Sequence, residues 1–564
     1  MKKILLLLMA GACIMACSTK KGDQVDLKYL PVGYDDDGKI YLDVSTGKKA
    51  ENSRRYDNAS YFVNGIAIVE NEDSLQFINS KFDLISKDKY AEVTYFSDGI
   101  AYAVKTNGRI QAIDKSGKVV FTLPDAEYAY RFKDGVSIFM TSDGKYGLVN
   151  TSGKILIEPG EFDEIGAGTN GMIRVAKETK SGRKWGIFTH AKKEVIPCEY
   201  ENIDFASDNT FLVEKNDKYG LVDMKNREII GKEYSALFIE DDGMILFGKY
   251  YKSKGTRYGW MNKKGEETID PSFEDVYPFN GTVGFMTFSG NLAAAERPSS
   301  KSDRTWGYID KKGEWVIEPK FQSATSFIDK KFALVENEDD EWGVINVKGE
   351  YIVKPRYSRV EYFGDGLIWV YNDGEEGIIN AKGETVVKLS DSYDFSFPQY
   401  ALYDFDRVQS QYVDVDAVVD LMMKQVQRLS VMPFTRENIA DEFDVQLDSY
   451  GRKTLSYDSN DYFTSKLSAF VDYDYDYSFY TGSYYIYYLT NLKAEFNFTS
   501  SKVYKNSSLI FNKFAKKLGA DCKMEAGGNV TGDRTFKLSS IPGCKGYLDY
   551  DFEVSFTPES GKIE

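Results

Sequence analysis

The chain has 564 residues, of which 42% are hydrophobic and 15% aromatic, with 41 Tyr and 36 Phe. This length exceeds what one hydrophobic core accommodates, so we expect two or more domains, and the apolar content excludes global disorder. The abundance of Tyr and Phe favours strands over helices. The formal net charge of −16 leaves no basic surface for phosphates, which excludes nucleic acid as a partner.

Residues 1–16 have the features of a secretion signal, because two lysines precede an apolar run too short to cross a membrane as a helix. The sequence Ile-Met-Ala-Cys at 14–17 resembles the lipobox of bacterial lipoproteins. The resemblance implies cleavage before Cys17, lipid attachment to it and, with Ser18 next, export to an outer membrane. Residues 17–27 would then form a tether, since two or three acyl chains hold a protein stably. An ordinary cleaved signal with an incidental cysteine is the alternative.

From about residue 28 the sequence repeats itself with a nearly constant period. An aromatic–Gly pair recurs, with weaker counterparts in the first three units and a last unit that lacks the aromatic residue. The positions of the glycine or its counterpart are Ile40, Gln76, Gln111, Gly147, Gly186, Gly220, Gly259, Gly307, Gly343 and Gly377. Successive positions are 34–39 residues apart, except for one step of 48. This spacing indicates a repeat architecture of about ten units.

Each unit has a pattern typical of short antiparallel strands. An aromatic–Gly–apolar–apolar–Asx run alternates as a strand, and the Asx-x-x-Gly that follows, as at 310–313, reverses the chain into a hairpin. The second strand often ends at a proline such as Pro319, which marks a strand end or an edge because it cannot donate to a ladder. A third strand, as at 331–337, closes the unit. We therefore expect three strands per unit.

These units resemble the WG-repeat family, a degenerate bacterial β-repeat named for its Trp-Gly pair. We predict that the aromatic residue fills the gap between adjacent units and that the glycine lets a neighbouring backbone approach closely. Aromatic platforms that stack on sugars are the alternative. The predicted repeat-core residues are Tyr146, Gly147, Trp185, Gly186, Tyr219, Gly220, Tyr258, Gly259, Trp306, Gly307, Trp342 and Gly343.

The fold class predicted is mainly β, with about ten WG-type β-repeats in a propeller-like array over 28–398, followed by a smaller α+β domain. Small antiparallel units stack radially as blades or linearly as a solenoid, and the strong hairpins favour blades. An open β-solenoid or superhelix is the alternative, because ten units are many for a closed ring. The 48-residue step contains a polar stretch at 289–303, which we interpret as an inserted surface loop.

Residues 399–564 show no repeat and are interpreted as an α+β domain of no recognised family. Apolar residues at 415–429 fall on one face of a helix. A second short helix is expected with Thr435 as its N-cap. A third is expected with Ser507 as its N-cap and Gly519 at its end.

The same domain is expected to contain strands with alternating side chains. The strands are expected at 484–498, 534–540 and 546–556. An Asp-Tyr tract at 472–477 places three carboxylates on one face of a strand. An EF-hand would need Gly and Glu where this tract has Tyr477 and Ser483, so we interpret it as a sheet with one acidic face rather than a Ca²⁺ site.

No set of residues typical of catalysis, metal binding or cofactor binding stands out. The single histidine, His190, has no nucleophile near it in sequence, and no His/Cys cluster has zinc spacing. The stretch 33–40 has the glycine spacing of a phosphate loop but lacks the hydroxyl residue, so we expect a hairpin turn. Cys522 and Cys544 are a possible disulfide in an oxidising compartment, with two unrelated thiols as the alternative. We expect Cys198 to belong to the core.

The sequence favours a lipid-anchored, non-enzymatic binding or scaffold protein of the cell envelope, with an envelope protein or a polysaccharide as its partner. Paired carboxylates acting on glycans leave a second class open. In that alternative the protein is an envelope hydrolase with a catalytic C-terminal domain, and the repeats target it. Whether an outer-membrane protein of this kind faces the periplasm or the cell surface is left open.

Overall fold

The structure is a computed structural model. The described residues are 25–34, 38–206, 209–240, 243–253, 255–273, 288–297, 305–389, 393–394, 397, 405–429, 452–478, 482–499, 501–525, 528–538 and 544–558. The chain forms two compact units. The first comprises residues up to 105 together with 109–410, and the second comprises residues 106–108 and 411–564.

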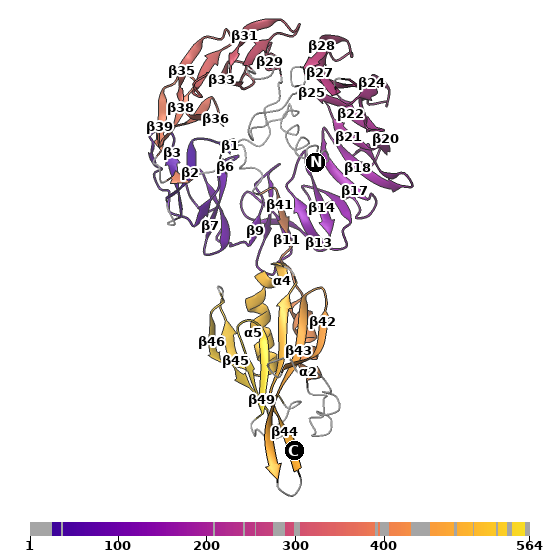
Figure 1. Cartoon of the computed structure of the whole chain (residues 1–564), viewed down its shortest axis with the longest axis vertical. Coiled ribbons are helices and arrows are strands. Elements are labelled where there is room, and N and C mark those ends of the chain that lie inside the picture. The colour runs from indigo at the N-terminus through magenta and orange to yellow at the C-terminus, as the bar shows by residue number, and fades with distance from the viewer. Residues whose placement is uncertain are drawn as a thin grey trace. The chain divides into compact units, whose positions relative to one another are not determined.

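The first unit consists of antiparallel sheets, ten of them within the described ranges, and Figure 1 shows them arranged as a ring. The first five sheets contain β2 (Tyr29–Tyr34), β3 (Lys39–Asp43), β4 (Lys48–Lys49) and β40 (Tyr393–Asp394); β1 (Val25–Asp26), β5 (Asn58–Ala59), β6 (Phe62–Val63), β7 (Ile66–Asn71) and β8 (Ser74–Asn79); β9 (Glu92–Val93), β10 (Ile100–Val104), β11 (Ile110–Asp114) and β12 (Val119–Leu123); β13 (Ala126–Tyr130), β14 (Val136–Thr141), β15 (Tyr146–Asn150), β16 (Ile155–Ile157) and β41 (Arg407–Gln409); β17 (Glu164–Thr169), β18 (Met172–Thr179), β19 (Gly182–Thr189) and β20 (Glu194–Tyr200). The other five contain β21 (Asn202–Phe205), β22 (Thr210–Lys215), β23 (Lys218–Asp223) and β24 (Glu228–Tyr234); β25 (Ala236–Ile239), β26 (Ile245–Tyr251), β27 (Gly255–Met261) and β28 (Glu267–Phe273); β29 (Ala293–Arg297), β30 (Thr305–Ile309) and β31 (Trp315–Phe321); β32 (Ser323–Ala324), β33 (Phe332–Glu336), β34 (Trp342–Asn346) and β35 (Tyr351–Tyr357); β36 (Arg359–Gly364), β37 (Leu367–Asn372), β38 (Glu375–Asn380) and β39 (Thr385–Leu389). The predicted mainly β repeat array is confirmed.

Seven of the ten sheets described in this ring have four strands, two have five and one has three, so the prediction of three strands per unit was wrong. The strand with the repeated glycine position is the third: β34, for example, lies between β33 and β35. The strand missed from the sequence comes first and is often short, as in the two-residue β32. Two residues are too few to show the alternation by which strands are recognised. The predicted hairpins and the edge position of the prolines are confirmed, because strands such as β31 and β35 are outermost in their sheets.

Clusters of buried side chains join each sheet to the next, and the last such cluster closes the ring. Ten clusters of this kind occur among the described residues, each shared by two neighbouring sheets. The closing cluster joins Leu30 and Val32 of β2 to Ile378 and Val387 of the tenth sheet. The backbone of β40 also pairs with that of β2. The array is therefore a closed, propeller-like ring rather than an open solenoid.

Two segments differ from the expectations at the ends of the ring and at its longest step. The first unit continues to Ser410, because β41 pairs with β13 and Val408 is buried in the cluster between the third and fourth sheets. The predicted surface loop at 289–303 is wrong for 293–297, which form β29 and pair with β30. Three small alanines there, at 293–295, are buried between sheets, which the polar flanks of the stretch had concealed.

The second unit combines α-helices with antiparallel sheets, which confirms its predicted α+β class. Its helices among the described residues are α2 (Val415–Arg428), α4 (Ser501–Lys505) and α5 (Ser507–Leu518). Its six-stranded sheet has the order β42 (Arg452–Ser459), β43 (Phe463–Ser478), β44 (Gly482–Phe498), β49 (Glu553–Pro558), β48 (Cys544–Leu548) and β47 (Thr535–Phe536), and β45 (Asp521–Met524) pairs with β46 (Val530–Asp533). The apolar faces of α2 and α5 pack with this sheet in one core.

The helix predictions hold where the structure describes them. Helix α2 buries one apolar face and begins after Asp414, whose side chain accepts from the N–H of Ala417. Helix α5 ends at Gly519, which has φ +84°, as predicted. The N-cap position of α5 is occupied by Asn506 rather than Ser507, and it makes no side-chain capping bond. The helix predicted from Thr435 lies outside the described residues.

The strand predictions in this unit hold in part. The strand expected at 484–498 lies within β44, and the Asp-Tyr tract lies on β43. The segment 546–556 is not one strand, because it turns between β48 and β49, which pair with each other.

In the first unit, the phosphate-loop-like stretch 33–40 joins β2 to β3 in an antiparallel pair, which confirms the predicted hairpin.

Candidate binding site

The repeated glycine lies opposite a bulge in the outermost strand of its own sheet. Trp185 pairs with Tyr200 and Ile187 pairs with Ile196, so three residues of β20 pass opposite the single residue Gly186. A Cβ at Gly186 would lie 2.5 Å from the carbonyl oxygen of Ile196. The other repeated glycines at which a Cβ would lie under 3.0 Å from outer-strand backbone are Gly220, Gly259, Gly307 and Gly343. The neighbouring backbone that these glycines admit is therefore the edge strand of the same sheet.

The residue before the glycine packs between sheets. These residues are half-buried and contact the inter-sheet clusters: Tyr146, Trp185, Tyr219, Tyr258, Trp306 and Trp342. Trp306 contacts the clusters on both sides of its sheet. The guanidinium carbon of Arg174 lies 4.7 Å from the centroid of the Trp185 ring. Gly147 differs from the other glycines, because a Cβ there would meet the ring of Phe139.

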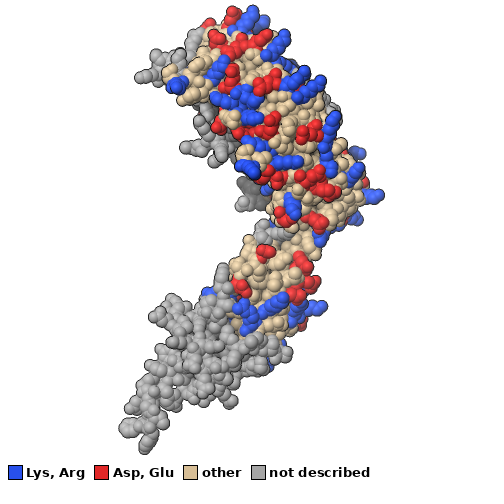
Figure 2. All heavy atoms as spheres, turned by 90° about the vertical axis from the view of Figure 1, so that its right-hand side faces the viewer, with Lys and Arg blue, Asp and Glu red and all other residues tan. Residues whose placement is uncertain are grey.

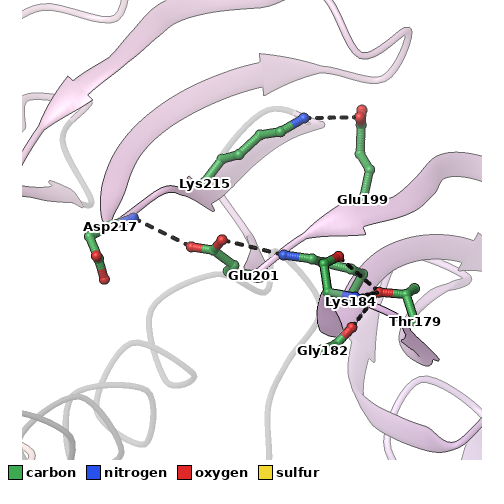
Figure 3. Close-up of polar contacts among 8 residues, drawn as sticks. Thr179, Gly182, Lys184, Glu199, Glu201, Lys215 and Asp217 are labelled. Carbon is green, nitrogen blue, oxygen red and sulfur yellow. Dashed lines mark hydrogen bonds and ion pairs between the residues drawn. The ribbon is translucent and has the colours of Figure 1, made fainter.

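Ion pairs near the hairpins connect neighbouring sheets. Glu201, after β20, accepts from Nζ of Lys184 at 3.3 Å and from the N–H of Asp217 in the next sheet at 3.4 Å (Figure 3). Nζ of Lys215 lies 3.2 Å from a carboxylate oxygen of Glu199, again across two sheets. Figure 2 shows positive and negative side chains interspersed over this side of the first unit. We assign these charges to contacts between sheets, since this face shows no extended field of one sign.

A cavity of about 300 Å³ lies where the first three sheets meet the segment before β41. Tyr61 and Tyr95 line it and are buried. The ring of Phe405 contacts that of Tyr95 edge-on, with centroids 5.3 Å apart, and the Phe405 carbonyl accepts from the Tyr95 N–H at 3.3 Å. The volume is at the lower end of the roughly 300–1,000 Å³ typical of ligand pockets. The remaining lining residues are Pro31, Lys39, Asn58, Ala59, Ser60, Ile68, Glu70 and Leu75.

The polar groups of this cavity lie at its more exposed side. Lys39 and Glu70 are half-buried and Asn58 is exposed, whereas the aromatic residues Tyr61 and Tyr95 are buried. Within the described ranges, the ammonium group of Lys39 and the carboxylate of Glu70 form no hydrogen bond or ion pair. The amide of Asn58 makes only a local bond, in which its oxygen accepts from the N–H of Ala59. These three groups are thus available to a ligand.

Tyrosine hydroxyls lie beside this cavity and are neutral. The Tyr41 hydroxyl donates to the carbonyl oxygen of Ser60 at 2.7 Å, and the rings of Tyr41 and Tyr56 meet edge-on. Burial raises the pKa of Tyr41, Tyr56 and Tyr61 above the ordinary value for tyrosine. The Tyr56 side chain is 4% exposed, and its hydroxyl has no hydrogen-bond partner in the described part of the chain. The surroundings of the cavity therefore contribute dipoles rather than further charge.

Neither the predicted lipid-attachment site nor the possible disulfide is part of this cavity. Cys17 lies outside the described residues. Cys198 and Cys522 are free thiols, and burial raises the pKa of each. The possible bridge between Cys522 and Cys544 is therefore not formed in the structure. The two cysteines lie on β45 and β48, which belong to different sheets.

His190 does not belong to a catalytic arrangement that the structure describes. It is half-buried, burial lowers its pKa, and its Nε2 has no hydrogen-bond partner among the described residues. Across those residues, no group of three or more His, Cys, Asp or Glu side chains is placed to hold a metal ion. In the same residues, no helix is both long and apolar enough to span a membrane.

The cavity was not predicted from the sequence, although part of its signal is visible there. Tyr61 and Tyr95 occupy the same position in consecutive units, each before Phe-x-Asx-Gly. Lys39 and Glu70 look like ordinary strand residues. Phe405 belongs to no repeat, so only the folded path of the chain places it beside Tyr95.

Solved structures match the chain at low sequence identity and low TM-score. The computationally designed Ika8 protein has 11% identity and a TM-score of 0.25, covering 59% of this chain and 94% of its own. A eukaryotic initiation factor has 9% identity and a TM-score of 0.33, covering 64% and 96%. BamB from Moraxella catarrhalis has 10% identity and a TM-score of 0.22, covering 65% and 97%. No curated protein matches the chain.

A sequence-family model identifies the repeats directly. The model described as "WG containing repeat" matches five segments: 146–180, 185–219, 258–281, 306–339 and 342–375. Each segment begins at or next to an aromatic–Gly pair whose packing is described above. The chain therefore contains WG repeats in these segments of the first unit.

Proposed function

We propose that the protein is a lipid-anchored scaffold of the cell envelope whose closed ring binds a protein or a polysaccharide. The observation that carries this proposal is the use of buried side chains in the ring. They join neighbouring sheets in a continuous circle, which makes a rigid support for the turns and for the cavity at the first three sheets. Binding residues on loops held by a rigid scaffold are a common arrangement.

The anchor and the location are proposed from the sequence at the N-terminus. The lipobox-like residues 14–17 support lipid attachment to Cys17, and Ser18 supports an outer-membrane location. Labelling of growing cells with an alkyne fatty acid, followed by membrane fractionation, tests both points. We expect label in the outer-membrane fraction for the native chain and none for Cys17→Ser. Label in the inner membrane, or label that persists in Cys17→Ser, would contradict this part of the proposal.

Cross-linking in intact cells tests the binding role. We expect the full-length chain to recover a specific envelope protein or a polysaccharide. The cross-links should map to turns or cavity residues of the first unit. Cross-links confined to 411–564 would move the function to the second unit and leave the ring as a spacer. Release of sugar fragments by the purified chain would favour the envelope hydrolase instead.

A further inference from the structure

We infer that the cavity between the first three sheets and Phe405 binds one uncharged sugar unit of a glycan. This inference rests on the proposed binding function and names a ligand class for one site within it. The chemistry of the lining residues, the size of the cavity and its singular position in the ring lead to it separately.

The lining residues combine flat apolar surfaces with polar groups of both kinds. Tyr61, Tyr95 and Phe405 place aromatic side chains in the lining, and the half-buried Phe405 offers the ring surface, which packs well against the C–H face of a pyranose. Lys39 and Asn58 supply donors, and Glu70 supplies an acceptor, at the more exposed side. Sugar hydroxyls both donate and accept, so one ring can satisfy all three groups at once.

The net charge of the lining and the volume of the cavity restrict the class of ligand further. The lining carries one cation and one anion, Lys39 and Glu70, which cancel and so give no preference for a charged ligand. A cavity of about 300 Å³ has room for one small ring but not for an extended oligosaccharide. The rest of a glycan would continue into solvent past Asn58, which is exposed.

The cavity also differs from the repeated features of the ring. The aromatic–Gly pairs recur from unit to unit and are used in packing, as Trp185 and Trp306 illustrate. Phe405 has no counterpart, because it precedes the strand β41 that returns to the fourth sheet. Its ring packs with the cluster between the second and third sheets and makes a wall of the cavity there. A site formed once is suited to a ligand rather than to the stacking of units.

Saturation-transfer NMR on the full-length chain in a sugar-free detergent tests the inference. The neutral probes are glucose, galactose, mannose, rhamnose and N-acetylglucosamine. Glucuronate and phenylalanine serve as charged and zwitterionic probes. We expect at least one neutral sugar to be saturated. Its affinity should fall about tenfold or more in Asn58→Ala, which loses a polar contact to the sugar, and in Glu70→Gln, which replaces a charged acceptor with a weaker neutral one.

Glu336→Gln is the matched control, since Val335-Glu336 of β33 repeats the sequence and strand position of Val69-Glu70. It should bind the sugar as the native chain does, and all three variants should melt as the native chain does. No saturation of any neutral sugar would overturn the inference. So would saturation of the charged or zwitterionic probes alone, or binding that is equal in Glu70→Gln and Glu336→Gln. Cross-linking to an envelope protein would still stand in those cases, so the two failures are distinguishable.

Discussion

Substitution of one repeated glycine tests the packing argument for the whole ring. In Gly186→Ala the new Cβ would lie 2.5 Å from the Ile196 oxygen and 2.8 Å from the Cys198 nitrogen, both backbone atoms. Since Cβ contacts under 3.0 Å essentially do not occur, the edge strand must move by at least 0.5 Å, the difference between 3.0 and 2.5. Ile196 and Tyr200 are buried in the next cluster, so the strand cannot move freely. We expect a loss of about 1–3 kcal/mol in the free energy of unfolding, as for other overpacked sites.

Urea denaturation followed by Trp fluorescence measures this loss. For an m-value of about 2–3 kcal/mol/M, the midpoint should fall by roughly 0.3–1.5 M. Gly231→Ala is the matched control, because Gly231 lies on β24 and a Cβ there would meet no atom within 4 Å. The control should have the native midpoint or a slightly higher one, since alanine reduces the entropy of the unfolded chain. Equal midpoints for the two variants would refute the account of the repeated glycine.

Three further changes probe other parts of the chain. In a calorimeter, a chain ending at 398 should melt at a lower temperature than one ending at 410. The shorter chain lacks β41 and the buried Val408, whose burial is worth about 1.5–3 kcal/mol. Equal melting temperatures would contradict this prediction. Glu240→Gln should lower the free energy of unfolding by about 1–3 kcal/mol and so lower the urea midpoint. Glu240 is 5% exposed and accepts from Nε1 of Trp260 at 3.0 Å and from the Phe288 N–H at 2.8 Å, so the amide nitrogen of the glutamine must face one of these donors. An unchanged midpoint would argue against these two buried hydrogen bonds. The C2–H NMR signal of His190 should titrate below pH 6.5, since burial lowers the pKa of the imidazole. The stability that the neutral imidazole contributes is therefore full above pH 6.5 and is lost as the pH falls from 6.5 through the lowered pKa. A titration midpoint at or above pH 6.5 would contradict its burial.

Much of the fold could be predicted because the signals are local. The alternation of an aromatic–Gly run and the Asx-x-x-Gly turn indicate β19 or β30 without any distant contact. The apolar period of 3.6 residues identified α2, where Val418, Val419 and Met422 are buried. The left-handed Gly519 ended α5 in the same way. Each of these features is decided within a few residues of the chain.

The parts that could not be predicted depend on contacts between distant residues. Closure of the ring depends on how the tenth sheet meets Leu30 of the first, and nothing in a single unit encodes that meeting. The cavity depends on Phe405 reaching Tyr95 across about three hundred residues of sequence. The alanines of β29 were interpreted as loop because small side chains give little hydrophobic signal, although they are buried between sheets.

The degenerate units clarify what the repeated glycine is for. Where glutamine replaces it, at Gln111, the edge strand pairs directly at that position, since Gln111 lies opposite Thr122 and Ala112 opposite Phe121. Gly377 also pairs directly with Lys388, and a Cβ there would be 3.0 Å from the nearest backbone atom. The bulge therefore accompanies the five closely approached glycines and not the position as such. A unit can lose its glycine when its edge strand has no bulge opposite that position, because the strand there stays at ordinary ladder distance. The five aromatic–Gly pairs that backbone approaches closely mark units with a bulge opposite the glycine, and the loss of the glycine in the first three units is compatible with the same ring of antiparallel sheets.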